Sequence, residues 1–520
     1  MPAIAANNTA ANEVVNGELS ATDLRDPADN TRYKDTYQLT NVTAGQRIQV
    51  KLESTAFDTV LQLVNAQTGA VIQENDDVNG DTTNSQITFT AQAGVEYLLR
   101  ATSYGANQTG SYALTVVRPN AVTSTPPPTA NQLVNQLQSA ELKTEVTTRI
   151  ADNTLDRNDA IAILRAGGTS GGGVDAIELD DLKLLVNNST QLNMPDAVRY
   201  FINRIVKDST ANTNTAQFES QIGRWFLGTE APTPIFNQPA RTDTGEAAQD
   251  FQLGYATLQG PLFGSASSAR IGHIDQGQLG DCAFLASLAA TFKPQRNDSG
   301  NQSSDIVDSM ITDNGDNTFT VRFYDATTLQ AQYVTVDRRV AIEPGTGELF
   351  AASADNQRDP SNPTNSATWV PLVERAYAQW RQETGQTGLP GYNAIGLGDS
   401  ITDPLTRIVG RRAQSYTFES GNTNTANFST IQSTLAAGGM FITTGTPDEK
   451  GDPFGKLIVP THAYTVTDAY IQGGEQRVVV RNPWGIDAYP GYGQGDFNDG
   501  FIDLAYSDFT RYFSDGLGIA

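Results

Sequence analysis

The sequence predicts a multidomain chain with an N-terminal β-sandwich, a helical middle region and a C-terminal region of mixed α and β structure. Two patterns lead to this expectation. Apolar and polar side chains alternate in short runs up to residue 118, whereas apolar residues recur at helical spacing from residue 133 onward. A chain of 520 residues is also too long for a single hydrophobic core, so several domains are expected.

Composition limits the classes of function. The chain has 34 Lys and Arg residues against 58 Asp and Glu residues, which gives a net charge of −24. We therefore expect no binding to nucleic acid or to an anionic membrane through bulk electrostatics. No segment approaches the roughly 18 consecutive apolar residues of a membrane span. The first residues lack a standard secretory signal, so we expect a soluble protein whose compartment and oligomeric state are left open.

Short alternating strands fill the first region, residues 1–118. Clusters of Gly, Asn and Asp separate them, as in an antiparallel β-sandwich. The clearest strands are Arg47–Leu52, Val60–Val64, Gln86–Thr90, Tyr97–Ala101 and Tyr112–Val116.

Several motifs in this region belong together: Asp35-Thr-Tyr37, Phe57-Asp-Thr-Val-Leu61, Asn75-Asp-Asp77 and Gly110-Ser-Tyr-Ala-Leu-Thr-Val116. They resemble the bacterial prepeptidase C-terminal domain. The resemblance implies a jelly-roll-like accessory module of a bacterial peptidase, in a protein that is cytoplasmic or secreted without a standard signal. Some members of that family bind calcium, and oxygen ligands could come from Asp58, Asp76, Asp77 and Asp81. The alternative is that these residues make turns.

Residues 119–132 contain the run Thr123-Ser-Thr-Pro-Pro-Pro-Thr129 and are expected to form a stiff linker. The helical region then covers residues 133–230. Within it, the glycine-rich run Ala166–Gly173 is expected to interrupt the helices as an exposed loop. Residues 231–254 are polar and contain prolines, so we expect a second linker there.

The only cysteine, Cys282, stands where a helix is expected to begin. It follows Gln276-Gly-Gln-Leu-Gly-Asp281 and precedes the apolar run Ala283–Ala290. Gly277 and Gly280 permit a tight backbone approach, and the N–H groups at a helix start favour a thiolate over a thiol. The pattern predicts a nucleophile. The alternative is a small buried residue, because lone cysteines are often inert.

A thiol nucleophile needs a base and a group that orients this base. The chain has only two histidines. We expect His273 at the surface or at the rim of a cleft. His462 opens an alternating strand that reaches Ile471, and a second strand after Gly473-Gly474 leads to Asn482. Such a hairpin would bring His462 near Asn482, although pairing about Gly473 leaves them offset by a few residues.

Three motifs in this order resemble the catalytic core of the calpain cysteine proteases: Gln276–Ala286, His462–Thr467 and Arg481-Asn-Pro-Trp-Gly485. The resemblance covers about residues 255–520. It implies a papain-like core of two lobes, about 255–410 and 411–520, with a cleft between them. The activity it implies is that of a cysteine endopeptidase that makes limited cuts in extended segments of protein or peptide substrates.

The resemblance also implies a role for each site residue. Cys282 is the nucleophile, His462 the general base and acid, and Asn482 the residue that orients the imidazole. Gln276 would form the oxyanion hole with the amide of Cys282, and Trp484 would shield the His–Asn contact from water. Two other functions stay open: a catalytically silent interaction protein with a β-sandwich binding module, and a thiol acyltransferase.

In animal calpains, calcium sites in both lobes bring the catalytic groups together. Here His273 takes one expected acidic position, although Glu374 keeps another, and Ile486 and Ala488 replace acidic residues after the Asn-Pro-Trp-Gly motif. A calcium ion with six to eight oxygen ligands is poorly served by this set. We therefore expect the core to need no cofactor, with calcium only in the β-sandwich. Control would then come from the N-terminal half, as in a self-processing zymogen whose helical region packs near the cleft. Ala283 also replaces the usual Trp after the cysteine.

Overall fold

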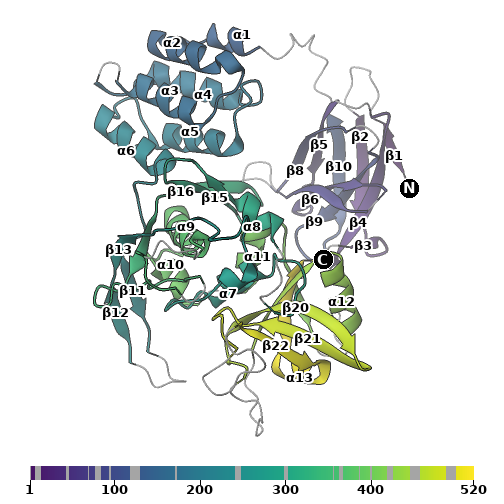
Figure 1. Cartoon of the computed structure of the whole chain (residues 1–520). Helices are drawn as coiled ribbons and strands as arrows, with labels where there is room; N and C mark the ends of the chain where they lie inside the picture. Colours follow the sequence, from purple (N-terminus) through teal and green to yellow (C-terminus); the bar gives the residue numbers. More distant parts are fainter. Residues whose placement is uncertain are drawn as a thin grey trace. The chain divides into compact units, whose positions relative to one another are not determined.

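The computed structural model divides the chain into two compact units, Met1–Pro128 and Thr129–Ala520 (Figure 1). The residues that it describes are 2–5, 13–27, 29–42, 46–67, 69–76, 83–92, 95–117, 129–169, 172–240, 247–297, 303–354, 357–361, 367–385, 387–398, 401–418, 426–445, 457–487 and 499–519.

Two sheets make up the first unit. One has the strand order β1-β4-β9-β6-β7 with β3 paired to β4, and the other has the order β2-β10-β5-β8. The five strands predicted between residues 47 and 116 are confirmed. The bounds are β1 Ala3–Ala5, β2 Glu13–Leu19, β3 Leu24–Asp26, β4 Asp29–Thr40, β5 Arg47–Glu53, β6 Thr59–Asn65, β7 Val71–Asn75, β8 Ser85–Thr90, β9 Tyr97–Ser103 and β10 Gly110–Val117.

The pairs of strands in these sheets run antiparallel, with the exception of β1, which is parallel to β4. Alternate side chains of both sheets pack into one hydrophobic cluster, to which Leu52 and Leu63 each contribute a fully buried side chain. The motif residues at 35–37 and 112 meet inside: Tyr112 Oη lies 2.6 Å from both the Asp35 carboxylate and the Tyr37 hydroxyl.

The predicted calcium ligands fall partly outside the described residues. Asp58 and Asp76 are described and half-buried, whereas Asp77 and Asp81 are not among the described residues. Within the described part of the chain, no group of three or more His, Cys, Asp or Glu side chains is arranged to hold a metal ion. Calcium binding by the first unit stays a prediction.

Six helices open the second unit, as predicted. They are α1 Ala130–Val134, α2 Ala140–Arg149, α3 Arg157–Thr169, α4 Ala176–Asn187, α5 Asp196–Asp208 and α6 Thr215–Phe226. The side chains of Ser139, Asp175 and Asn214 accept backbone N–H groups at the starts of α2, α4 and α6. The apolar faces of these helices pack into one cluster around Phe201 and Ile202.

We expected a loop at Ala166–Gly173, but residues 166–169 of this glycine-rich run are helical. Helix α3 continues through Gly167 and Gly168, both buried. A Cβ at Gly168 would lie 2.4 Å from the Phe218 ring on α6, and one at Gly167 would lie 3.2 Å from Leu142 on α2. At Gly168 a side chain would clash with the Phe218 ring unless that ring moved, and at Gly167 the approach is tight, so close packing outweighs the low helix propensity of glycine.

The second predicted linker is also wrong in part. Residues 231–254 include β11 Ile235–Gln238 and β12 Gln249–Gln252, an antiparallel pair. Phe236 and Leu253 are buried in the core that surrounds α7. At the first linker, α1 already begins at Ala130, capped by Thr129.

The rest of the second unit mixes helices with strands. The helices are α7 Cys282–Ala289, α8 Asp305–Met310, α9 Trp369–Thr384, α10 Asn393–Gly396, α11 Thr402–Val409, α12 Phe428–Ala436 and α13 Tyr506–Tyr512. The strands are β13 Gly254–Thr257, β14 Ile311–Asp313, β15 Phe319–Tyr324, β16 Ala331–Val336, β17 Arg339–Ile342, β18 Gln414–Thr417, β19 Met440–Thr444, β20 Ala463–Gln472, β21 Glu475–Arg481, β22 Phe501–Ala505 and β23 Asp515–Ile519.

Two hydrophobic cores divide this mixed part. One surrounds α7 and α9, and the other lies under a six-stranded sheet with the order β18-β23-β19-β20-β21-β22, which we call the C-terminal sheet (Figure 1). A smaller cluster joins Ala283 and Ala286 of α7 to Ile442 and Ala463 of that sheet. The cysteine helix therefore lies against the C-terminal sheet.

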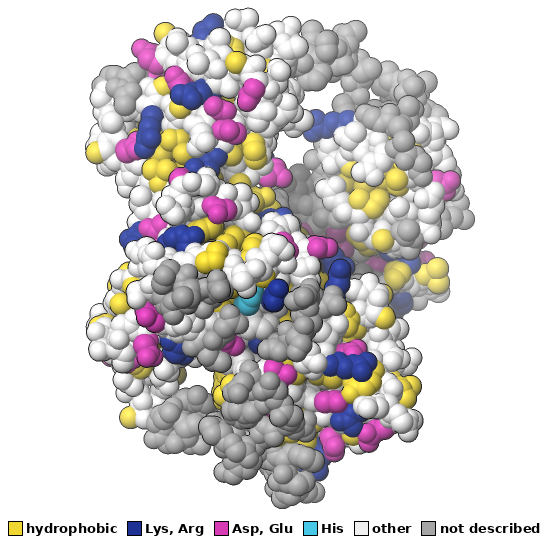
Figure 2. Space-filling view, viewed as in Figure 1, with side chains coloured by type: hydrophobic (Ala, Val, Ile, Leu, Met, Phe, Trp, Pro, Cys, Tyr) yellow, Lys and Arg dark blue, Asp and Glu magenta, His cyan; other side chains and the backbone are white. Residues whose placement is uncertain are grey.

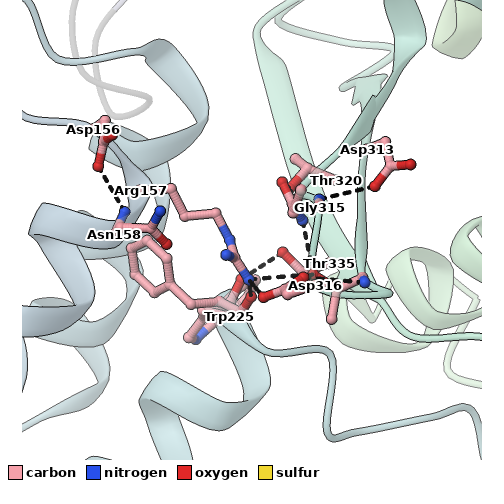
Figure 3. A network of polar contacts seen from close by, with 12 residues as sticks. Asp156, Arg157, Asn158, Trp225, Asp313, Gly315, Asp316, Thr320 and Thr335 are labelled. Atoms are coloured by element: carbon pink, nitrogen blue, oxygen red, sulfur yellow. Dashed lines mark hydrogen bonds and ion pairs between the residues drawn. The ribbon is translucent and has the colours of Figure 1, made fainter.

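The helical region is docked on strands β15 and β16. Arg157, at the start of α3, donates to the backbone carbonyl of Phe226 (2.6 Å) and to Asp316 (2.8 Å) and Thr318 (3.2 Å) in the loop before β15 (Figure 3). Thr335 of β16 donates to the Trp225 carbonyl at 2.7 Å, and beside it aromatic rings of both parts meet edge to face.

Acidic and basic side chains are interspersed on the face drawn in Figure 2, among many uncharged ones. In the part of the chain that the structure describes, no helix has both the length and the apolar character to cross a membrane.

Replacing Arg157 by Ala should weaken the docking of the helical region. The variant loses two hydrogen bonds to the loop before β15 and one to a backbone carbonyl, so we expect a loss of about 1–2 kcal/mol in unfolding free energy. Urea denaturation measures this loss. Arg165→Ala is the control, because its pair with Glu219 is exposed and should contribute less than about 1 kcal/mol. Equal losses in both variants would contradict the docking role.

Candidate active site

Cys282 is the first residue of α7, as predicted. The carbonyl of Asp281 accepts the backbone N–H groups of Phe284 and Leu285, which starts the helix. The two glycines before it do what the sequence suggested: a Cβ on Gly277 would lie 2.1 Å from the Ala351 carbonyl oxygen, and one on Gly280 would lie 2.7 Å from that of Gly396. The turn before the cysteine is thus wedged between two other backbone segments.

The protonation state of the thiol differs from our expectation. Burial raises the pKa of Cys282 to about 11, and the negative charge of Asp281 adds to this. The N–H groups of Ala463, Ala283 and Cys282 contact the sulfur and lower its pKa, but they do not compensate. Desolvation outweighs the helix N-terminus here, so the resting site holds a neutral thiol whose proton must be taken by a base.

His462 and Asn482 are joined by a hydrogen bond. His462 Nε2 lies 2.8 Å from Asn482 Oδ1, and both residues are buried. The orientation of the Asn482 amide follows from its other partners: Nδ2 donates to the Asp487 carbonyl at 3.1 Å, and Oδ1 accepts the Trp484 N–H at 3.0 Å. Because Oδ1 accepts, Nε2 carries the proton in the neutral imidazole, and its lone pair is on Nδ1.

An irregularity in the β20–β21 hairpin places this pair. The register is Asp468 opposite Val479 but Val466 opposite Val480, so Thr467 is an extra residue in β20. One more step beyond Thr465 and Arg481 would bring Tyr464 opposite Asn482. His462 is two residues from Tyr464 and therefore on the same face. Without the extra residue, Asn482 would pair one position later and His462 would point away.

The backbone before His462 is held in an unusual conformation. Thr461 has a φ of 55°, in the left-handed region that β-branched residues avoid. Gly445, at the end of β19, holds the turn from both sides: its N–H donates to the His462 carbonyl at 2.9 Å, and its carbonyl accepts the Thr461 N–H at 2.8 Å. The surrounding backbone thus fixes the approach of His462 to the cleft.

Gln276 and Trp484 both reach the same cleft. Gln276 Nε2 donates to the Leu279 carbonyl at 2.6 Å, and its second contact, to Asp281 Oδ1, is long at 3.4 Å. One amide hydrogen is therefore only weakly held. The Trp484 ring packs on the imidazole of His462, with 4.8 Å between ring centroids.

His273 does not lie at the surface or at a cleft rim. It is buried, and its Nδ1 accepts a hydrogen bond from Trp369 Nε1 at 3.0 Å. Burial lowers the pKa of His273 to about 4, so the ring is neutral near pH 7. This histidine is a structural residue of the core around α7.

Two buried carboxyl groups, those of Asp281 and Glu374, face each other behind the cysteine. Burial raises the pKa of both above the ordinary range of carboxyl groups, and for Glu374 the nearby charge of Asp281 adds to the shift. Glu374 also accepts the Ala352 N–H at 2.8 Å. The pair ties α9 to the turn that carries Gln276 and Cys282.

A cleft of about 1030 Å³ brings the predicted residues together. Cys282, His462, Gln276 and Trp484 line it, and Asn482 lies behind His462. Direct hydrogen bonds join the two sides: Thr465 Oγ1 donates to the Ala286 carbonyl (2.6 Å), and the Gln276 N–H donates to the Pro483 carbonyl (2.8 Å).

Part of the cleft wall was missed in the sequence. Phe236, Gln238, Gln249 and Phe251 line the cleft, although their segment was taken for a linker. The alternation Asp-Phe-Gln-Leu at 250–253 was the available signal for a short strand, whereas Ile-Phe-Asn-Gln at 235–238 does not alternate.

Residues 257–513 match the family described as calpain family cysteine protease. This part of the chain is a calpain-type domain. The recognition of a calpain-type core from its three motifs is confirmed, and so is the broad order of strands, helices and a C-terminal calpain domain along the chain.

Curated relatives cover less of the chain. Calpain-7 of Sus scrofa is 26% identical over 219 residues, and calpain-7 of Mus musculus and of Homo sapiens are each 25% identical over the same length. The alignments take in 41% of this chain and 24% of each relative. The chain therefore matches about a quarter of the length of these calpains.

Two solved structures are similar to 22% of the chain. The first is the pre-peptidase C-terminal domain of a collagenase from Bacillus anthracis, at 19% identity, 93% coverage of that structure and a TM-score of 0.17. The second is PliG of Aeromonas hydrophila, a periplasmic inhibitor of g-type lysozyme, at 17% identity, 94% coverage and the same TM-score.

Replacing Gly277 by Ala should destabilise the calpain-type domain by at least about 2 kcal/mol, because the new Cβ meets backbone atoms that cannot move aside. Thermal unfolding followed by circular dichroism measures the effect. Gly345→Ala is the matched control, since a Cβ there has no atom within 4 Å. Similar melting temperatures for the two variants would show that the turn is not confined.

Proposed function

We propose that the chain is a calpain-like cysteine endopeptidase that makes limited cuts in extended protein segments. The observation that carries the proposal is the hydrogen bond between His462 and Asn482 in the wall of a cleft that also holds Cys282. The membership of residues 257–513 in the calpain family supports it. The activity of the whole chain is proposed here and not transferred from the relatives, because the chain matches about a quarter of their length.

In the proposed mechanism, His462 Nδ1 takes the proton from the Cys282 thiol, and the sulfur attacks the scissile carbonyl carbon. The C–N bond then breaks as the imidazolium gives its proton to the departing amine. Water, activated by the same imidazole, cleaves the thioester and releases the acid product. Asn482 stabilises the imidazolium because its Oδ1 accepts a hydrogen bond from Nε2–H throughout the reaction, and the proton stays on Nε2.

The oxyanion of the tetrahedral intermediate would lie near the Cys282 N–H and Gln276 Nε2. The long contact of this amide to Asp281 makes one of its hydrogens available to an incoming oxygen. Trp484 would exclude water from the His–Asn contact, since its ring covers the imidazole. These donors stabilise charge that develops only during the reaction.

We also propose that the calpain-type domain assembles without calcium. Direct hydrogen bonds join the cysteine helix to the C-terminal sheet, which supports the proposal. Among the positions expected to be acidic, residue 273 is a buried neutral histidine and Ile486 is apolar, and Ala488 lies outside the described residues. Glu374 is engaged with Asp281 and Ala352.

We also propose self-cleavage, but only at a site outside the helical region. The helical region is docked on β15 and β16, and the described residues that line the cleft come from other segments. A cut that frees the helical region would have to break this docking. A cut between the two compact units, near Pro128, would not, so we propose that segment as the site of self-cleavage.

Replacing Cys282 by Ser should abolish casein cleavage, because a hydroxyl in this buried site has no base strong enough to ionise it at neutral pH. Labelling of the wild type by a thiol-reactive epoxide should be lost in the same variant. Intact bands in both proteins after long incubation would contradict self-cleavage.

Labelling without casein cleavage would favour the silent interaction protein. Transfer of the acyl group to an added amine instead of water would favour the acyltransferase. Casein cleavage that persists in Cys282→Ser would overturn the proposal altogether.

Excess chelator should leave casein cleavage unchanged, because direct protein contacts hold the two sides of the cleft together. The initial rate with EGTA, compared with the rate after added calcium, measures this. Loss of cleavage in EGTA and rescue by calcium would overturn the calcium-independent proposal while supporting the peptidase itself.

A further inference from the structure

The β11–β12 pair forms one wall of the cleft, and it precedes the part of the chain that matches the calpain family, residues 257–513. The pair therefore lies outside the residues that match the family. The pair is antiparallel, with Phe236 opposite Phe251 and Gln238 opposite Gln249.

Only one face of this pair is turned to the cleft. Side chains two positions apart in a strand lie on the same face, so Phe236 and Gln238 share a face with Gln249 and Phe251. All four line the cleft, whereas Asn237 and Asp250 on the other face do not. On this face Phe236 is buried, so the hairpin presents the ring of Phe251 and, beyond it, two uncharged amides.

The wall is anchored near the nucleophile. Asn237 and Asn393 exchange two hydrogen bonds of 2.7 Å, which fix β11 to α10. Phe251 packs on Phe350 with 5.0 Å between ring centroids. The Phe350 carbonyl in turn accepts the N–H of Gln278, in the turn that leads to Cys282.

The chemistry of this face selects a ligand class. Phe251 is half-buried, and Leu397, at the same cleft, is 40% exposed, so apolar surface is open to a side chain there. Gln238 and Gln249 can donate to and accept from a peptide backbone. An acidic side chain would lose water at this face without gaining a partner, and Glu343 at the same cleft carries a like charge.

We propose that this face is a substrate subsite that takes an apolar side chain of an extended peptide against Phe251, with the backbone hydrogen-bonded by Gln238 and Gln249. This inference rests on the proposed function, because it assumes that the ligand of the cleft is a peptide whose scissile bond reaches Cys282. It makes the hairpin a specificity element of the cleft.

The test measures labelling of Cys282 in the full chain by a series of peptidyl epoxides, in which one residue is leucine, serine or aspartate and its distance from the epoxide varies. In the wild type, one distance should give labelling that is at least about tenfold faster for leucine than for serine. Phe251→Ala should bring this ratio close to one. Gln252→Ala, on the face turned away, should leave it unchanged.

A second variant guards against loss of folding in Phe251→Ala. Gln249→Lys keeps the aromatic packing and adds a positive charge, so the aspartate epoxide at the same distance should gain several-fold over the leucine epoxide. Iodoacetamide, too small to reach the hairpin, should label Cys282 equally in all variants.

A leucine preference that is absent in the wild type, or that survives in Phe251→Ala with Gln249→Lys also unaltered, would overturn the subsite. Failure of the proposed peptidase would look different: the epoxides would show the subsite preference while casein stays intact.

Discussion

The candidate site depends on hydrogen bonds that join two separate hydrophobic cores. Cys282 opens helix α7 of the core around α7 and α9, and His462 directly precedes strand β20 of the C-terminal sheet. Thr465 bonds to the cysteine helix, and buried Arg481 donates to the Ile274 carbonyl at 2.9 Å. Because these bonds are shielded from water, losing one partner would leave a buried polar group unpaired. The distance between thiol and imidazole is thus fixed by the fold.

Burial sets the charge state of the site as much as any single partner does. The Cys282 thiol, the Asp281–Glu374 pair and His273 all shift toward their neutral forms, because a charge in a water-poor environment is costly. The helix N-terminus beside the cysteine is too weak to reverse this. In the neutral imidazole of His462 the proton is on Nε2, which donates to Asn482, and the lone pair is on Nδ1.

Glycine permits a close approach of neighbouring atoms both in the turn before Cys282 and in helix α3, but the sequence led us to expect this only in the turn. At Gly277 and Gly280 the sequence correctly suggested a close backbone approach, because the turn motif was recognisable. At Gly167 and Gly168 the same residue type suggested a loop, yet helix α3 continues and packs closely on Leu142 and Phe218. Local propensity cannot distinguish these cases, because the neighbour that requires glycine lies far away in the sequence.

Periodicity in the sequence by itself determined the strands of the first unit, the helices that follow and the hairpin that carries His462, since local alternation reflects which side chains are buried. The motif before Cys282 likewise located the helix start. Tertiary structure decided the rest. The extra residue at Thr467 turns His462 and Asn482 to one face, and burial makes the thiol neutral. Strands β11 and β12 form a cleft wall because Phe236 packs in a core built mostly from residues far away in the sequence. Each of these depends on neighbours that only the folded chain brings together.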